Sequence, residues 1–220
     1  MIEYAYGNWL FVAFVVAFTA TFLLSLLRPR TSSEWRNFGL TQAFFVALFT
    51  EMFGFPLTIY ILSSVSGTAL SFGHSQGHLL GVVIGNVTGL GPGFGEAVVM
   101  ATSAVVILLG TLLVAAGWRA IYRGNGAFVT DGPYARIRHP QYLGLMIVVT
   151  GFLIQWPTLI TLVMAPLLFG AYVRLAAHEE TDLRLRYGHL YEEYAMKVPR
   201  FLPRLGRRRG AKLASGGGAA

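Results

Sequence analysis

Long uncharged apolar stretches dominate this chain, and charged residues interrupt them at only a few places. Three stretches, 8–27, 38–62 and 97–118, each contain at least 20 residues, and only the second holds an acidic or basic side chain, Glu51. A helix of about 20 residues crosses a hydrocarbon core of roughly 30 Å. We therefore expect a transmembrane helix in each stretch. An acid at membrane depth usually faces a bundle interior or a cavity, so Glu51 is a candidate substrate contact, with a protonated packing residue as the alternative.

Two shorter apolar stretches, 142–156 and 158–173, meet at Trp156 and Pro157. They predict a tight antiparallel hairpin that spans the membrane only if flanking residues contribute or the bilayer thins locally. Pro166 should kink the second helix, because proline removes one backbone hydrogen bond. Together the five stretches predict an all-α polytopic membrane protein with about five transmembrane helices.

The pattern changes after the hairpin. Apolar and aromatic residues recur at helical spacing between 178 and 196, which predicts an amphipathic helix on the cytoplasmic face. Two prolines in 198–203 end that helix, and 205–220 has the basic, then Gly/Ala-rich composition of a disordered tail. The chain thus divides into an N-terminal three-helix membrane region, 1–118, a C-terminal region, 119–204, and the tail, 205–220.

The charges indicate how the chain sits in the membrane. Hydrophobic residues make up 55% of the chain and charged residues 12%, and the formal net charge is +7. The 17 Lys and Arg residues all lie within 28–36, 119–138 and 174–212. By the positive-inside rule these segments are cytoplasmic and the N-terminus is outside. Because the Lys and Arg residues lie only in these segments, we expect them to contact membrane lipids rather than nucleic acid. No obligate protein partner is evident.

Two further observations bear on processing and chemistry. The first residues lack a basic n-region, so the first helix is expected to be a retained anchor rather than a cleaved signal. The chain has no cysteine, which excludes disulfides, thiolate nucleophiles and cysteine-ligated metals.

The segment 63–95 is rich in Gly and Ser and has no Lys or Arg, so it is expected to be a linker on the outer side, with a flexible turn at 89–95. His74 and His78 would share one face of a helix, as zinc ligands sometimes do. The glycines between them disfavour such a helix, and we expect no metal site.

Two bursts of charge flank the predicted hairpin. The first, 131–144, contains Tyr134, Arg136, Arg138, His139 and Tyr142, and the second contains Arg174, His178, Glu179 and Glu180. An antiparallel hairpin returns the chain to its starting side, so the two bursts should meet at its cytoplasmic mouth. Such a site suits a compact zwitterionic ligand. Arg138 or His139 would hold a carboxylate, Glu179 or Glu180 an ammonium or hydroxyls, and aromatic rings a flat heterocycle. The alternative is a cluster that only orients the protein and binds anionic headgroups.

The sequence GPYARIRHPQYLG, the acidic pair and the continuation LRLRYGHLYEEYAMKVPRFLP resemble the signature of the isoprenylcysteine carboxyl methyltransferase family and its phospholipid methyltransferase relatives. The resemblance covers about 119–204 and implies an integral-membrane enzyme that binds S-adenosylmethionine without a Rossmann domain. It implies that 119–204 is the cofactor-binding catalytic region and that 1–118, where such relatives differ, determines the substrate. It implies that the cofactor pocket is lined by Arg138, His139, Pro140, Tyr142 and Gly144 of the RHPxYxG element and by Glu179 and Glu180. From their places in the two bursts, Tyr134 and His178 are expected to join them.

The acceptor of the methyl group stays open between an isoprenylcysteine carboxylate, which we favour, a phospholipid amine and a small thiol. A carboxylate acceptor needs only a cation to hold it, for which Arg174 and Arg200 are candidates, whereas an amine must be deprotonated by a residue such as Glu180 or a histidine. Glu180 and Arg174 are therefore the candidate catalytic residues. A different class remains open as well, a transporter or assembly subunit in which Glu51, His74 and His78 form a polar path.

Overall fold

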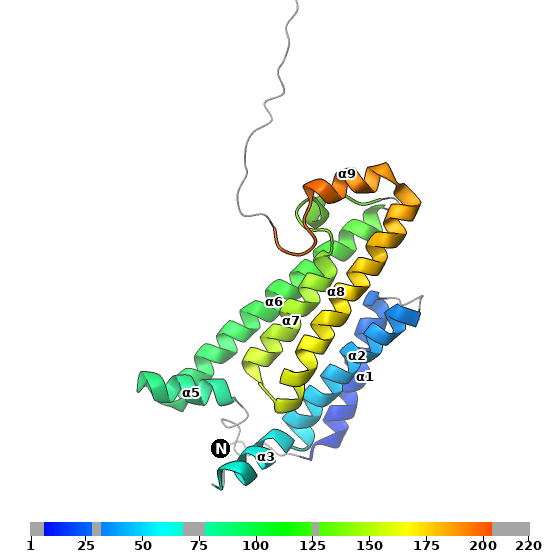
Figure 1. The fold of residues 1–220 in the computed structure, drawn as a ribbon. Coiled ribbons are helices and arrows are strands. Elements are labelled where there is room, and N and C mark those ends of the chain that lie inside the picture. The colour runs from blue at the N-terminus through cyan, green and yellow to red at the C-terminus, as the bar shows by residue number, and fades with distance from the viewer. Residues whose placement is uncertain (1–6, 28–31, 68–77, 125–127, 204–220) are drawn as a thin grey trace, which may run out of the picture.

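The computed structural model describes residues 7–27, 32–67, 78–124 and 128–203, and every regular element in these ranges is helical. The helices are α1 (Trp9–Leu27), α2 (Ser32–Phe49), α3 (Leu57–Ser66), α5 (Leu79–Thr88), α6 (Pro92–Gly124), α7 (Pro140–Gln155), α8 (Leu159–Tyr187) and α9 (His189–Lys197). A π-helical turn, Thr50–Gly54, follows α2, and a 3-10 turn, Gly132–Ala135, precedes α7. In Figure 1, α6, α7 and α8 run side by side, α1 and α2 lie beyond α8, and α9 covers one end.

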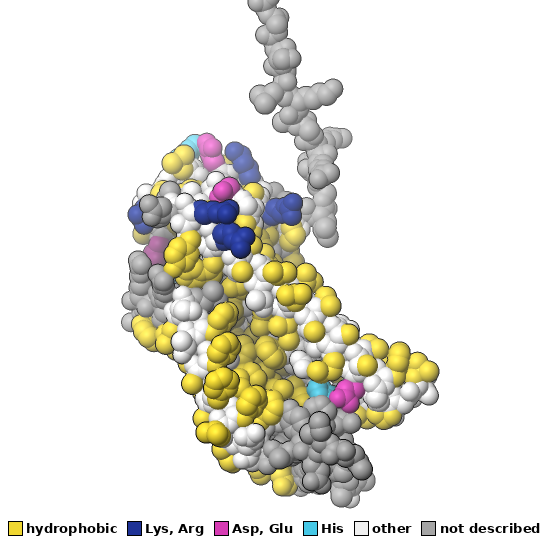
Figure 2. Space-filling view, turned by 180° about the vertical axis from the view of Figure 1, so that it is seen from behind, with side chains coloured by type: hydrophobic (Ala, Val, Ile, Leu, Met, Phe, Trp, Pro, Cys, Tyr) yellow, Lys and Arg dark blue, Asp and Glu magenta, His cyan; other side chains and the backbone are white. Residues whose placement is uncertain are grey.

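The helices mark the chain as an integral membrane protein. By length and composition α6 and α8 can each cross a bilayer, and α2 together with α3 would form a third span bent by 69°. The apolar helices Trp9–Ser25, Leu79–Thr88 and Pro140–Gln155 are shorter. Large hydrophobic side chains are exposed along the helices, as the yellow surface in Figure 2 shows. The all-α fold is confirmed, while five spans and an external N-terminus stay predictions.

Several predicted boundaries were wrong. The single helix expected over 38–62 is broken by the π-helical turn and Pro56, and part of the expected linker forms α5. The helix expected to end near 173 continues through Pro166 to Tyr187. It ends there because Gly188 adopts a φ of +50°, which L side chains rarely take. The predicted amphipathic helix is therefore divided between the last turns of α8 and all of α9.

Glycines allow α6 and α7 to pack with their backbones almost touching. A Cβ atom added at Gly144 would lie 2.8 Å from the carbonyl oxygen of Gly110, and one added at Gly110 would lie 2.7 Å from that of Gly144. Gly151 meets Ile107 and Ser103 of α6 in the same way. This row of glycines, the α6–α7 seam, fixes the start of α7 against α6, as small residues do between transmembrane helices.

The hairpin of α7 and α8 is anchored to α2 by aromatic and polar contacts. The hydroxyl groups of Thr41 and Tyr172 lie 2.7 Å apart in the interior, and both side chains are buried. The rings of Phe45 and Phe49 meet Phe152 edge to face, with centroids 5.6 and 6.2 Å apart. The N-terminal helices thus reach the rest of the bundle through α8 and the second half of α7.

Glu51 lies at the hairpin turn. Its carboxylate accepts hydrogen bonds from the backbone N–H and the hydroxyl of Thr58, each 3.0 Å long, and the Thr58 hydroxyl also accepts from the N–H of Leu159. The acid therefore joins the bend after α2 to the first turn of α8. Since α7 has 16 residues, this end of the hairpin is about 24 Å from the start of α7.

Candidate functional site

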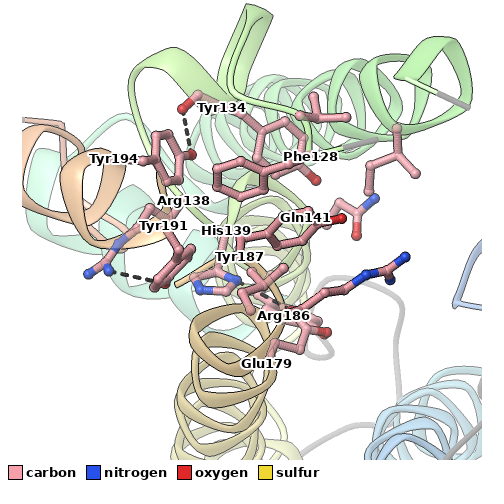
Figure 3. Close-up of a pocket in the computed structure, with 14 residues that line it drawn as sticks. Phe128, Tyr134, Arg138, His139, Gln141, Glu179, Arg186, Tyr187, Tyr191 and Tyr194 are labelled. Carbon is pink, nitrogen blue, oxygen red and sulfur yellow. Dashed lines mark hydrogen bonds and ion pairs between the residues drawn. The ribbon is translucent and has the colours of Figure 1, made fainter. Parts of the chain in front are cut away.

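A cavity of about 310 Å³ opens between the ends of α6, α7 and α8 and the helix α9 (Figure 3). It is lined by Ile121, Phe128, Val129, Tyr134, Arg138, His139, Gln141, Tyr142, Glu179, Leu183, Arg186, Tyr187, Tyr191 and Tyr194. The lining combines an aromatic wall with a few ionic groups. This mixture is typical of pockets that bind a small ligand in one orientation.

The two bursts of charge meet at this cavity, as the hairpin predicted. His139, which directly precedes α7, lies with Nε2 3.0 Å from Oε1 of Glu180 and with Nδ1 3.5 Å from Oε2 of Glu179. The hydroxyl of Tyr142 donates a hydrogen bond to Glu179. Successive acids on α8 thus hold the first turn of α7, and Pro140 fixes where that helix begins.

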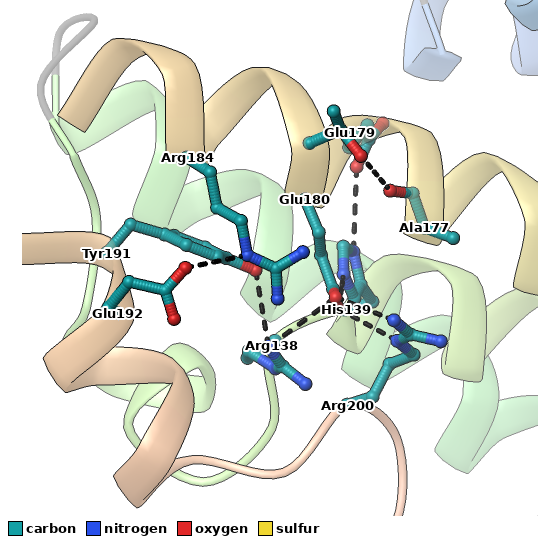
Figure 4. A network of polar contacts seen from close by, with 10 residues as sticks. Arg138, His139, Ala177, Glu179, Glu180, Arg184, Tyr191, Glu192 and Arg200 are labelled. Carbon is teal, nitrogen blue, oxygen red and sulfur yellow. Dashed lines mark hydrogen bonds and ion pairs between the residues drawn. The ribbon is translucent and has the colours of Figure 1, made fainter. Parts of the chain in front are cut away.

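Glu180 is the centre of an ionic network and is only 1% exposed (Figure 4). Arg200 donates to both of its carboxylate oxygens, from Nε at 2.8 Å and from Nη2 at 2.6 Å. Arg138 approaches with Nη1 at 3.5 Å, and His139 completes the set. A buried carboxylate with three cationic partners is well compensated. It orients these partners but does not itself line the cavity.

The network changes the protonation of His139. Burial alone would lower the pKa of the imidazole, but hydrogen bonds to Glu179 and Glu180 and the charges of both acids outweigh burial, so its pKa is raised. The protonated form is thereby favoured. The ring is held between the two acids of α8.

The aromatic wall comes from α9, the end of α8 and the segment before the 3-10 turn. Phe128 stacks on Tyr187 with centroids 4.9 Å apart and meets Tyr194 edge to face at 5.3 Å. Tyr194 donates to the carbonyl oxygen of Tyr134 at 2.7 Å, and burial raises the pKa of Tyr194 to about 12. Arg138 donates to the hydroxyl of Tyr191 at 3.3 Å, which joins this wall to the ionic network.

Sequence reasoning found the charged half of the cavity but missed most of the aromatic half. Tyr134 and Tyr142 were expected in the site, whereas Phe128, Gln141, Arg186, Tyr187, Tyr191 and Tyr194 were not. Tyr187, Tyr191 and Tyr194 recur at helical spacing, and this pattern predicted the apolar face of an amphipathic helix but not its place in the site.

Other predicted residues lie elsewhere. Gly144 packs against α6 in the seam rather than against the cavity. Arg174 and His178 are exposed on α8 and are not among the lining residues. Glu51 is at the far end of the hairpin, and Arg200 reaches the site through Glu180. The structure thus brings together most of the expected cofactor residues but not the expected substrate contacts.

No group of three or more potential metal ligands occurs among the described residues. His78 is buried, with Nδ1 2.9 Å from the carbonyl oxygen of Gln155 and Nε2 3.9 Å from Glu96. It supports the hairpin turn, and its predicted companion His74 lies outside the described residues.

Comparison with known proteins addresses the family. Residues 94–184 match the model of the isoprenylcysteine carboxyl methyltransferase (ICMT) family. The cobalt-zinc-cadmium resistance protein CzcN of Cupriavidus metallidurans is 33% identical over 109 residues, which is 47% of this chain and 50% of that protein. The methanethiol S-methyltransferase of Crocosphaera subtropica is 29% identical over 185 residues, 74% of this chain and 68% of that protein.

A third relative is the protein-S-isoprenylcysteine O-methyltransferase of Schizosaccharomyces pombe, 36% identical over 76 residues, 34% of this chain and 32% of that protein. The chain therefore spans between about a third and two thirds of the length of these relatives. No solved structure matches it. The segment matched by the family model runs from the start of α6 nearly to the end of α8 and contains both acids and the RHPxYxG element. Over residues 94–184, the chain is similar to the isoprenylcysteine carboxyl methyltransferase family.

Proposed function

We propose that this chain is an integral-membrane methyltransferase that binds S-adenosylmethionine in the cavity and methylates a lipidic or small hydrophobic acceptor. The observation that carries this proposal is the contact of His139 with both Glu179 and Glu180 at an aromatic-lined cavity. It joins the two parts of the sequence signature into one site, and it lies within the family-matched segment.

The cavity suits the chemistry of this cofactor, which carries a carboxylate, an ammonium, hydroxyls and a flat heterocycle. Arg138 and Arg186 offer cations, and the partly exposed Glu179 offers a carboxylate for an ammonium or hydroxyls. The rings of Phe128 and Tyr187 offer flat apolar surface. The volume is near the lower end of the roughly 300–1,000 Å³ typical of ligand pockets, which favours one compact ligand.

The bound cofactor would supply a methyl group already activated by its sulfonium charge, so the protein mainly has to position the reactants and exclude water. In this proposal His139 and Arg138 are held rigidly by Glu180. Glu179 contacts the ligand directly, because it lines the cavity and Glu180 does not. For an acceptor that must lose a proton, Glu179 is also the carboxylate within reach of the cavity.

Two acceptor classes fit this proposal. An isoprenylcysteine carboxylate is the first, since the family-matched region includes Arg138, His139 and both acids of the ionic site. A small thiol is the second, because the relative named for methanethiol S-methylation aligns with 74% of this chain, whereas the S. pombe relative aligns with 34%. The longer alignment necessarily includes part of 1–118, which we expect to determine the substrate.

We further propose that the cavity faces the cytoplasm. Arg119 and Arg123 lie near the end of α6 on the cavity side, where the positive-inside rule places the cytoplasm. A water-soluble cofactor would then enter from the cytoplasm.

The test uses the purified chain in detergent or nanodiscs. Cofactor binding is measured by calorimetry, and transfer of a labelled methyl group is measured with an isoprenylcysteine analogue, phospholipid vesicles and a small thiol. Binding should collapse in His139→Ala and Glu180→Ala and persist in Glu193→Ala, whose side chain is an exposed acid of α9. Undiminished binding in the first two variants refutes the site. If none of the three acceptors is methylated, the proposed activity is refuted.

A further inference from the structure

The segment Val198–Phe201, here called the C-terminal strap, is bonded directly to the RHPxYxG element. The backbone N–H of Arg138 donates to the carbonyl oxygen of Pro199 at 2.9 Å, and that of His139 donates to the carbonyl oxygen of Arg200 at 3.2 Å. The ring of Phe201 lies 5.9 Å from the imidazole of His139. Two successive backbone bonds fix the register of the strap, and therefore the place from which Arg200 extends its side chain.

From this position Arg200 makes a two-pronged contact with Glu180. Its Nε and Nη2 atoms donate to the two carboxylate oxygens at 2.8 and 2.6 Å, the geometry in which arginine binds a carboxylate most strongly (Figure 4). Arg138 is more distant from the same carboxylate, at 3.5 Å. Arg200 is thus the main cationic partner of an acid that is almost completely buried.

The network would change if this partner were lost. Glu180 would keep only His139 and the longer contact with Arg138, and an under-compensated buried carboxylate draws its remaining partners or water toward itself. Both remaining partners line the cavity. A change at Arg200, which does not line the cavity, would therefore move groups that do.

On the basis of the proposed function, we propose that Arg200 is a positioning residue of the cofactor site, acting through Glu180 to hold Arg138 and His139 against the ligand. It does not hold the acceptor, because its Nε and Nη2 atoms are already committed to Glu180. The inference extends the functional site beyond the family-matched segment, which ends at residue 184. It also assigns the strap a role in methyl transfer besides ending α9.

The experiment measures the cofactor dissociation constant of the full chain in nanodiscs for the wild type, Arg200→Gln, Arg200→Lys and the control Lys197→Gln. Lys197 is three residues away, and its exposed ion pair with Glu193 is 3.9 Å long. Arg200→Gln should weaken binding about ten-fold or more, since it removes hydrogen bonds to a charged group. Arg200→Lys should recover part of the loss, because an ammonium keeps the charge but not the two-pronged geometry. The control should bind as the wild type does.

A double-mutant cycle tests whether the effect passes through Glu180. Added to Glu180→Gln, the Arg200→Gln change should weaken binding less than about two-fold, because interacting residues are not additive. An equal loss in both backgrounds overturns the proposal. Binding is compared below the unfolding temperature of every variant. If Arg200 only stabilises the fold, Arg200→Gln will lower the unfolding temperature and leave the cofactor affinity unchanged, and this result also overturns the proposal.

The KM for the acceptor distinguishes a positioning role of Arg200 from direct binding of the acceptor. It should stay unchanged in Arg200→Gln, and an increase with normal cofactor affinity would assign Arg200 to the acceptor and overturn the positioning role. If the wild type binds no cofactor, both the proposed function and this inference fail. If the wild type binds and Arg200→Gln binds as tightly, only this inference fails.

Discussion

Gly144→Ala tests the α6–α7 seam. The new methyl group would lie 2.6 Å from Cγ2 of Val114 and 2.8 Å from the carbonyl oxygen of Gly110. The valine side chain can turn away, but the oxygen belongs to a helix backbone and can move only if the helices separate. Overpacking of this kind costs about 1–3 kcal/mol, while replacing glycine by alanine within a helix returns roughly 0.5–1 kcal/mol. We expect a net loss of about 1–2 kcal/mol.

This loss is measurable by thermal unfolding in one detergent. For a chain of this size it lowers the unfolding temperature by about 2–8 °C. The matched control is Gly170→Ala in α8, where a Cβ atom would meet nothing within 4 Å. There the gain from alanine is unopposed, so the unfolding temperature should stay level or rise. If Gly144→Ala proves as stable as Gly170→Ala, the seam is looser than described and the reasoning is refuted.

Three further substitutions probe the network and the hairpin turn. Protonated His139 should stabilise the fold fully below pH 6.5, its ordinary pKa, and should lose this contribution as the pH rises through its raised pKa. The unfolding temperatures of the wild type and His139→Gln should therefore converge at alkaline pH, and a gap that stays constant with pH would contradict this. Tyr142→Phe removes the hydroxyl that donates to Glu179 and should weaken cofactor binding about ten-fold by calorimetry, whereas an unchanged affinity would show that the bond does not support the site. Thr58→Val removes the hydroxyl that links Glu51 to the hairpin and should cost about 1–3 kcal/mol of stability in denaturant unfolding; a large change in cofactor affinity would contradict its remote position.

The sequence was informative wherever connectivity constrained the geometry. Two short apolar stretches joined at Trp156 and Pro157 can only return the chain, so the meeting of His139 with Glu180 followed from the hairpin. The RHPxYxG element indicated a family resemblance for the same region, and the match of the family model to 94–184 confirms that resemblance.

Long-range and directional features were not predictable. Pro56 is a local signal for a kink after α2, but nothing local in the sequence sets its 69° angle. Periodicity showed that Tyr187, Tyr191 and Tyr194 share a face, but the direction of α9 depends on the backbone of Gly188. The contact between Arg200 and Glu180 joins residues 20 positions apart through a turn and a second helix, and no local pattern encodes it.

The α6–α7 seam also limits how a lipid-soluble acceptor can reach the cavity. At Gly110 and Gly144 the two helices leave too little space even for one added carbon atom, so an acyl or prenyl chain cannot pass between them. Any lateral gate for a membrane-dissolved acceptor must therefore lie on another side of the bundle. The seam is closed to a lipid chain, so the helices on the opposite side of α8, α1 and α2, are the first place to look for an entry route.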